Sequence, residues 1–324
     1  MARYAARRLA QSIPTVFILS VVIFVLMRMI PGNISDVILA DAGGTAQERA
    51  EQKLVIEREL GIAEPGVTQY VKWVGGVLRG DFGRSLWDGT SVSSDVARRA
   101  RVSGWLAAWI AITASAFAVP LGIVAATCRS RRAVDQSILF MSTIGISIPT
   151  FVSATLVIYG LVTAFGWTPS LHYAHFWESP FTNLSIIVAP VLIESYSIGS
   201  PIMRMVRSSL RDTMGQDYTR TATAKGLHPR TVIIRHAVRN AMTPIIGYMG
   251  WSLSRLIGGL VILETMFNMP GLGKGLIDAV NHRDYATIQG FVLVIGVGYV
   301  MFNLLVDLAI AWADPRVRLA ERHA

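Results

Sequence analysis

Charged side chains within apolar stretches are the residues of this sequence with the clearest potential for chemistry. Glu194 and Arg255 each lie near the middle of a long apolar run, and Glu264 lies at the end of the run that contains Arg255. An ionisable group at membrane depth is costly, so it is a functional candidate by default. Glu194 and Arg255 are candidates to line a polar passage, and a structural ion pair, with each other or with another subunit, is the slightly favoured interpretation. Glu264 is a candidate gate residue, for which an interfacial salt bridge is the favoured interpretation.

No set of residues has the spacing of a catalytic or metal site. The glycine-rich stretch 271–275 lacks the spacing of a phosphate-binding loop and the Ser or Thr after its lysine, and we interpret it as an external turn. His172 and His175 lie three residues apart without further ligands, and the single Cys128 excludes an intrachain disulfide or a cysteine-rich zinc site. We therefore predict that the chain is not an enzyme and carries no cofactor.

The elements that position these residues are apolar helices. Of the 324 residues 52% are hydrophobic and 16% are charged, where a soluble domain has about 25% charged residues. Six stretches reach the roughly 20 residues that a membrane-spanning helix needs. They predict an all-α polytopic membrane protein with six transmembrane helices, at Leu9–Ile30, Gly104–Thr127, Ser137–Phe165, Ile186–Met205, Met242–Leu263 and Ile288–Trp312.

The distribution of basic residues predicts the orientation. With six spans both termini lie on one side, and that side receives seventeen of the 30 Lys and Arg residues. Cytoplasmic loops are enriched in Lys and Arg, so we expect both termini in the cytoplasm. Arg98, Arg99 and Arg101, just before the second span, oppose this assignment. The net charge of +9 is then mainly an orientation signal, and nucleic acid is not needed to explain it.

The predicted spans divide the chain into four regions. Residues 1–30 form the N-terminal tail and first span, 31–103 an extracytoplasmic helical segment, 104–313 the core of five spans, and 314–324 a cytoplasmic tail. In the outer segment Ala46–Leu60 and Val67–Leu78 have helical patterns. This segment is either a lid that packs on itself or a docking site for a soluble partner.

A cytoplasmic loop, residues 204–240, is the most informative part of the core. Residues 217–225 have the pattern of a short helix that ends at Gly226, and Pro229 starts another helix. The small residues Ala222 and Ala224 permit close approach of another protein. An amphipathic helix lying on anionic lipid is the alternative.

Several motifs together resemble the permease subunits of ABC importers for dipeptides, oligopeptides and nickel. The resemblance begins at the loop Arg220–Leu227 and extends over essentially the whole chain. The motifs, in family order, are Pro31-Gly32, Tyr70–Trp73, Gly80–Ser85, Pro120–Gly122, Ile148–Phe151, Arg204–Ser209, Arg220–Leu227, Arg235–Asn240 with Pro244, Glu264 with Phe267 and Pro270–Gly273, Asn303–Asp307 and Asp314–Arg316.

The resemblance implies a type I ABC importer permease fold in the inner membrane of a bacterium. It implies a heterodimer with a homologous permease, two cytoplasmic ATPase subunits that hold ATP and Mg, and an external substrate-binding protein. The residues it assigns to contact with an ATPase are Thr219, Arg220, Thr221, Ala222, Ala224, Lys225, Gly226 and Leu227. The family's acidic and first alanine positions are Arg220 and Thr221 here, and Asn33 replaces an acidic residue after Pro31-Gly32.

The resemblance leaves the transported solute open among peptides, nickel chelates, glutathione and opines. A peptide carries an amine and a carboxylate, whose charges Glu194 and Arg255 would compensate. A secondary transporter or channel that works without an ATPase is the alternative function. It would be expected to show internal repeats and discontinuous helices, and no repeat is visible in the sequence.

Overall fold

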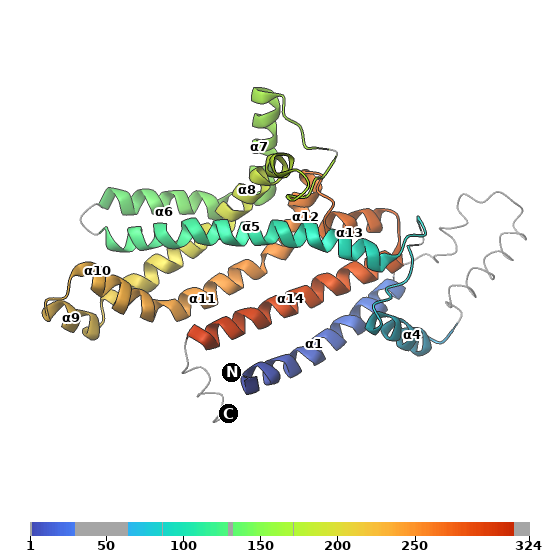
Figure 1. The fold of residues 1–324 in the computed structure, drawn as a ribbon, viewed down its shortest axis with the longest axis horizontal. Helices are drawn as coiled ribbons and strands as arrows, with labels where there is room; N and C mark the ends of the chain where they lie inside the picture. Colours follow the sequence, from blue (N-terminus) through green and yellow to red (C-terminus); the bar gives the residue numbers. More distant parts are fainter. Residues whose placement is uncertain (1, 30–63, 86, 129–131, 171, 314–324) are drawn as a thin grey trace, which may run out of the picture. The chain divides into compact units, whose positions relative to one another are not determined.

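The computed structural model of the protein describes residues 2–29, 64–85, 87–128, 132–170 and 172–313, and most of these residues lie in helices (Figure 1). Within those ranges the one β contact is an isolated bridge between Arg84 and Ser91. The elements are α1 (Ala2–Met29), α4 (Gly66–Leu78), α5 (Val92–Thr127), α6 (Arg132–Ser147), α7 (Thr150–Phe165), α8 (Pro180–Met214), α9 (Asp217–Ala224), α10 (Pro229–Thr231), the π-helix η1 (Val232–Val238), α11 (Arg239–Ser254), α12 (Leu256–Met266), α13 (Leu272–Asn281) and α14 (Tyr285–Ala313). The all-helical prediction is confirmed.

Four helices are long and apolar enough to cross a membrane, namely α1, α5, α8 and α14. Two further candidates are bent pairs, α6 with α7 at 98° and residues 229–254 with α12 at 40°. The described residues therefore hold four continuous candidate spans, or six if each bent pair counts as one. Ser137–Phe165 and Met242–Leu263 were expected as continuous helices, and this expectation was wrong.

The sharper break has a local cause in Pro149. Proline lacks an N–H donor and disfavours helical geometry at the residue before it, so helices usually end there. Here α6 ends at Ser147, Pro149 has extended backbone with φ −60° and ψ 142°, and α7 starts at the next residue. Figure 1 shows α7 turning away from α6 at this point.

Helix ends differ from the apolar stretches because polar residues continue several helices. Helix α5 begins at Val92, well before the expected Gly104, and α8 covers Pro180–Met214 instead of Ile186–Met205. The stretch 271–275 was expected as a turn, but Gly271 precedes the first residue of α13. A glycine is required within that helix, since a Cβ at Gly275 would lie 2.6 Å from the Phe291 ring.

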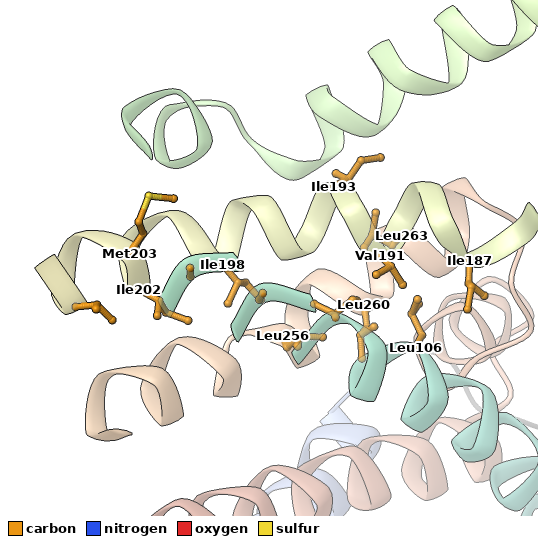
Figure 2. Packing of buried hydrophobic residues seen from close by; sticks show 14 of the residues in the cluster. Leu106, Ile187, Val191, Ile193, Ile198, Ile202, Met203, Leu256, Leu260 and Leu263 are labelled. Atoms are coloured by element: carbon orange, nitrogen blue, oxygen red, sulfur yellow. The ribbon is translucent and has the colours of Figure 1, made fainter. Parts of the chain in front are cut away.

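The chain divides into two compact units, which are described separately. The first contains the described residues of Met1–Leu9, Val102–Pro270 and Met301–Ala324. Its core surrounds α8, which packs against α6, α7, α11 and α12. Figure 2 shows α8 side chains such as Val191 and Ile198 facing Leu106 of α5 and Leu256 and Leu260 of α12. Burial of these side chains provides the main packing energy of the unit.

Close contact between α6 and α8 depends on a glycine. A Cβ at Gly145 would overlap the Ser200 hydroxyl and lie 3.1 Å from the Tyr196 ring. We expect Gly145→Ala to destabilise the protein by about 1–3 kcal/mol, because overpacking forces neighbouring side chains or backbone to move. The measurement is the apparent thermal midpoint of the purified protein in detergent. Gly160→Ala in α7 is the matched control, since a Cβ there meets nothing within 4 Å; an equal loss in both variants would contradict the packing argument.

The second unit contains the described residues of Ala10–Arg101 and Gly271–Val300. The prediction of a helix at Val67–Leu78 is confirmed by α4, whose Tyr70 and Trp73 rings contact Phe24 of α1 at centroid distances of 5.1 and 6.0 Å. Val92, Val96 and Phe291 form a separate apolar cluster. The expected helix at Ala46–Leu60 lies outside the described residues.

A tight turn precedes α5 in this unit. The Asp88 carboxylate accepts hydrogen bonds from the Thr90 hydroxyl at 2.7 Å and from the Thr90 N–H at 3.0 Å. These bonds hold the pKa of Asp88 below its ordinary value, because they stabilise the charged form. The Trp87 ring stacks on the His282 ring with centroids 4.3 Å apart, so the turn is fastened to the end of α13.

Candidate functional site

A polar cavity of about 780 Å³ lies in the first unit, beside α8 and next to both helix breaks. Thr150 is the first residue of α7, and Arg255 separates α11 from α12. The cavity thus brings together Glu194 and Arg255, which the sequence singles out for a polar passage. Its lining residues are Leu139, Ile146, Thr150, Glu194, Ser197, Ile198, Pro201, Arg204, Met205, Arg207, Ser208, Tyr248, Ser252, Arg255 and Gly259.

Glu194 is a buried carboxylate at this cavity. It is 4% exposed, and its Oε2 atom has no hydrogen-bond partner. The Oγ atom of Ser252, which is 3% exposed, likewise has none. Gly259 of α12 gives the carboxylate its space, since a Cβ there would overlap Oε1 and lie 2.9 Å from Cδ. Buried polar groups are normally satisfied, so these two atoms require an explanation.

Arg255 lies at the 40° break and is exposed. Its guanidinium carbon lies 5.4 Å from the centre of the Trp251 ring. Among the described residues no carboxylate oxygen, including those of Glu194, comes within 4.0 Å of its nitrogens. The two charges share the cavity without forming a direct ion pair in this chain.

Glu264 does not line the cavity. Its side chain is fully buried, and Oε1 accepts a hydrogen bond of 2.6 Å from the Ser103 hydroxyl of α5. Helix α12 places Glu264 on its buried side together with Leu260 and Leu263, and the expected interfacial salt bridge of this carboxylate stays a prediction. Its role as a gate residue stays a prediction.

Sequence reasoning missed an ionic cluster between α6 and α8. The Asp135 carboxylate accepts three hydrogen bonds from arginines of α8. Arg207 donates from Nε at 2.5 Å and from Nη2 at 2.8 Å, and Arg211 donates from Nη2 at 2.8 Å. Arg211 also donates to the carbonyl of Ala125 in α5 at 3.1 Å. The signal available in the sequence was the i, i+4 spacing of the two arginines, but nothing local indicated Asp135, more than 70 residues away, as their partner.

The expected short helix is confirmed as α9, with Gly226 in the left-handed region at φ +77°. Two of the eight predicted contact residues, Thr219 and Ala222, are buried at 4% and 6% exposure, whereas the other six, including Ala224, are exposed. The Thr219 hydroxyl donates to the Thr213 carbonyl of α8 at 2.9 Å. The two small residues therefore differ in exposure, since Ala222 is buried against its own chain and Ala224 is exposed.

Other polar residues of the predicted spans have partners within their own unit. Asp307 of α14 pairs with Arg8 of α1 at 3.3 Å. Arg28 donates to Gln69 of α4 and lies over the Phe24 ring. His175 stacks on Trp177, and no group of three metal-ligating side chains occurs in the described ranges.

Comparisons with known proteins agree over the whole length. Residues 118–319 match the family of binding-protein-dependent transport system inner membrane components, and residues 1–93 match that family's N-terminal component. A probable peptide ABC transporter permease of Sinorhizobium fredii is 36% identical over 98% of this chain and 100% of its own. A glutathione transport system permease of Salmonella paratyphi A is 34% identical over 98% and 99%, respectively.

Among solved structures, an amino acid ABC transporter crystallised with histidines matches with a TM-score of 0.52 at 13% identity. The match covers 67% of this chain and 94% of the other, and it supports the fold alone. In this family transport is driven by a separate ATPase, and the solute is delivered by a binding protein. The chain belongs to the family of binding-protein-dependent transport system inner membrane components, and it is the multi-pass inner-membrane permease subunit of an ABC importer.

Proposed function

We propose that this permease forms, with a homologous permease, the translocation pathway for a short peptide or a related small solute. Two ATPase subunits that bind ATP and Mg drive it, and an extracytoplasmic protein delivers the solute. Each bent helix pair counts as one span, which gives six spans with both termini in the cytoplasm. In this arrangement residues 31–103 lie outside, and α9 lies on the cytoplasmic side. The full-length similarity to permeases named for peptides and glutathione carries the proposal.

Helix α8 supports a mechanical route from the ATPase to the pathway. It carries cavity residues from Glu194 to Ser208, then Arg211 of the ionic cluster, and then the Thr213 carbonyl that holds α9. One continuous helix, which rises about 1.5 Å per residue, thus links the two sites. Closure of the ATPases on α9 would move α8 together with α6, and so change access to the cavity between inward-open and outward-open states.

The cavity residue Arg255 is expected to act on the solute. Arg255→Met should lower uptake about fivefold, which corresponds to roughly 1 kcal/mol of lost charge interaction. It should spare assembly, because the side chain is exposed and makes no ion pair with the described residues. The measurements are uptake into proteoliposomes and the yield of the purified complex. Loss of the complex would instead show that Arg255 pairs with another subunit.

The subunit composition is tested by isolation from membranes. A tagged version of this chain, extracted in mild detergent, is expected to bring down one homologous permease and two ATPase subunits, as measured by native mass spectrometry. Isolation of this chain alone, or of a complex with no ATPase, would contradict the proposed assembly.

A further inference from the structure

We propose that Glu194 and Ser252 form a subsite for a primary ammonium group of the transported solute. This inference rests on the proposed function, since it places the solute in the cavity beside α8. It goes further by assigning one chemical group of the solute to two named atoms. The solute class is then a compound with a free amine, such as a peptide with an unmodified N-terminus.

Two unsatisfied polar atoms carry the inference. Glu194 and Ser252 both line the cavity, and their atoms Oε2 and Oγ are almost completely buried and have no hydrogen-bond partner in the described chain. A carboxylate can only accept hydrogen bonds, whereas an ammonium group offers three N–H donors and no acceptor. An ammonium group therefore supplies the donors and the charge that the Glu194 carboxylate lacks, and the Ser252 hydroxyl can accept another of its N–H bonds. Such charge-assisted bonds are about twice as strong as neutral ones.

Helix α12 has a glycine, Gly259, at the position where it contacts the Glu194 carboxylate. Gly259 permits an approach that any side chain would block, since its Cβ would overlap Oε1. The neighbouring Gly258 has no such restriction, because a Cβ there meets nothing within 4 Å. The carboxylate is thus held in a niche of α12, with Oε2 left unpartnered.

The other charges at the cavity leave room for a cation at Glu194. Arg255 interacts electrostatically with Glu194, but it does not come within 4.0 Å of the carboxylate. Arg207 is engaged in an ion pair with Asp135. Arg204 lies ten residues from Glu194 on α8, about 15 Å along the helix axis. The arrangement offers a negative end at Glu194 and positive groups at Arg204 and Arg255, which suits a zwitterionic solute.

The subsite is tested by the charge preference of a thiol placed beside it. Cys128→Ser removes the single native cysteine, and Ser197→Cys places a thiol at the cavity, one helical turn from Glu194. The full chain is purified in detergent with the subunits that co-isolate with it. The rates of modification by 2-aminoethyl and 2-sulfonatoethyl methanethiosulfonate are then compared, and their ratio reports the local preference for an ammonium group over an anion.

Glu194→Gln is expected to lower this ratio about tenfold, because a fixed opposite charge concentrates a cationic reagent near it. Ser252→Ala should lower the ratio by a smaller factor, and Glu194→Asp should retain part of the preference. Glu264→Gln is the matched control, since this buried carboxylate does not line the cavity. The yield of the complex identifies a variant that fails to fold. If Glu194→Gln fails to fold, the modification ratios of Glu194→Asp and Ser252→Ala are compared with that of the parent protein instead.

An unchanged ratio in Glu194→Gln and Ser252→Ala would overturn the subsite. The assay requires no transport, so its failure is distinguishable from failure of the proposed function. ATP-driven uptake without a charge preference at the cavity would support the proposed function and contradict the subsite. A charge preference without ATP-driven uptake would support the subsite and contradict the proposed function.

Discussion

Replacing Ala224 with tryptophan is expected to reduce ATP-driven uptake at least tenfold, equivalent to about 1.4 kcal/mol or more of lost contact with the ATPase. Ala224 is the last residue of α9 and is exposed, so a larger side chain should leave the fold of this chain unchanged. It would instead occupy the space of a closely packed partner surface. The measurements are uptake into proteoliposomes and the amount of ATPase that co-purifies, both of which should fall together.

The matched control is Ala133→Trp. Ala133 is also an exposed alanine, and it lies in the first turn of α6, at the end of that helix that we place in the cytoplasm. It lies outside the predicted contact segment. Its replacement should leave both uptake and ATPase binding close to the wild-type level. Normal ATPase binding in Ala224→Trp would show that α9 does not form the contact. The lipid-surface interpretation of this helix would then be favoured.

Replacing Asp135 with alanine is expected to destabilise the protein and uncouple α6 from α8. The change leaves Arg207 and Arg211 without their carboxylate, and removing one partner of a largely buried pair is strongly destabilising. The Arg207 side chain is 20% exposed and that of Arg211 37%, so solvent reduces the loss to about 2 kcal/mol. The apparent thermal midpoint of the complex should fall by about 5 °C.

Asp212→Ala provides the comparison for this change. Asp212 is an exposed carboxylate next to Arg211 on the same helix, with no ion pair within 4.0 Å in the described chain. Its loss should change the thermal midpoint little, because surface charges contribute at most about 1 kcal/mol. If both variants lose the same stability, the Asp135 cluster has no special role. A charge swap, Asp135→Arg with Arg207→Asp, should recover part of the loss.

Composition and local patterns predicted the helical class and the approximate position of the four continuous candidate spans. They also predicted α4 and α9, whose ends are set by the local signals of Pro65 and Gly226. The break at Pro149 had a visible signal that a hydropathy argument overlooked. The break at Arg255 had none, because no proline stands there and both flanking segments are apolar.

Long-range pairing could not be predicted. The contacts of Asp135 with Arg207, of Glu264 with Ser103, and of Gly259 with Glu194 join residues far apart in sequence. A charge count places a residue on one side of the membrane without naming its partner. Arg207 and Arg211, two basic residues of the loop 204–240, thus bind a carboxylate of their own chain, which their sequence positions do not indicate.

Discontinuous helices were expected to mark a secondary transporter, yet the structure has two bent pairs. This criterion does not separate the two transporter classes for this chain. The family match over residues 118–319 and the full-length relatives do, since they are permeases of ABC systems. In this chain the two helix breaks lie at the cavity that Glu194 and Arg255 line.

Uptake into proteoliposomes, with and without the ATPase subunits, tests the central claim most directly. The complete complex, supplied with its binding protein, a radiolabelled short peptide, ATP and Mg, is expected to accumulate the peptide. Omission of the ATPase subunits, or replacement of ATP by a non-hydrolysable analogue, should reduce accumulation to the level of empty vesicles. Sustained accumulation by this chain without an ATPase and without ATP would contradict the account.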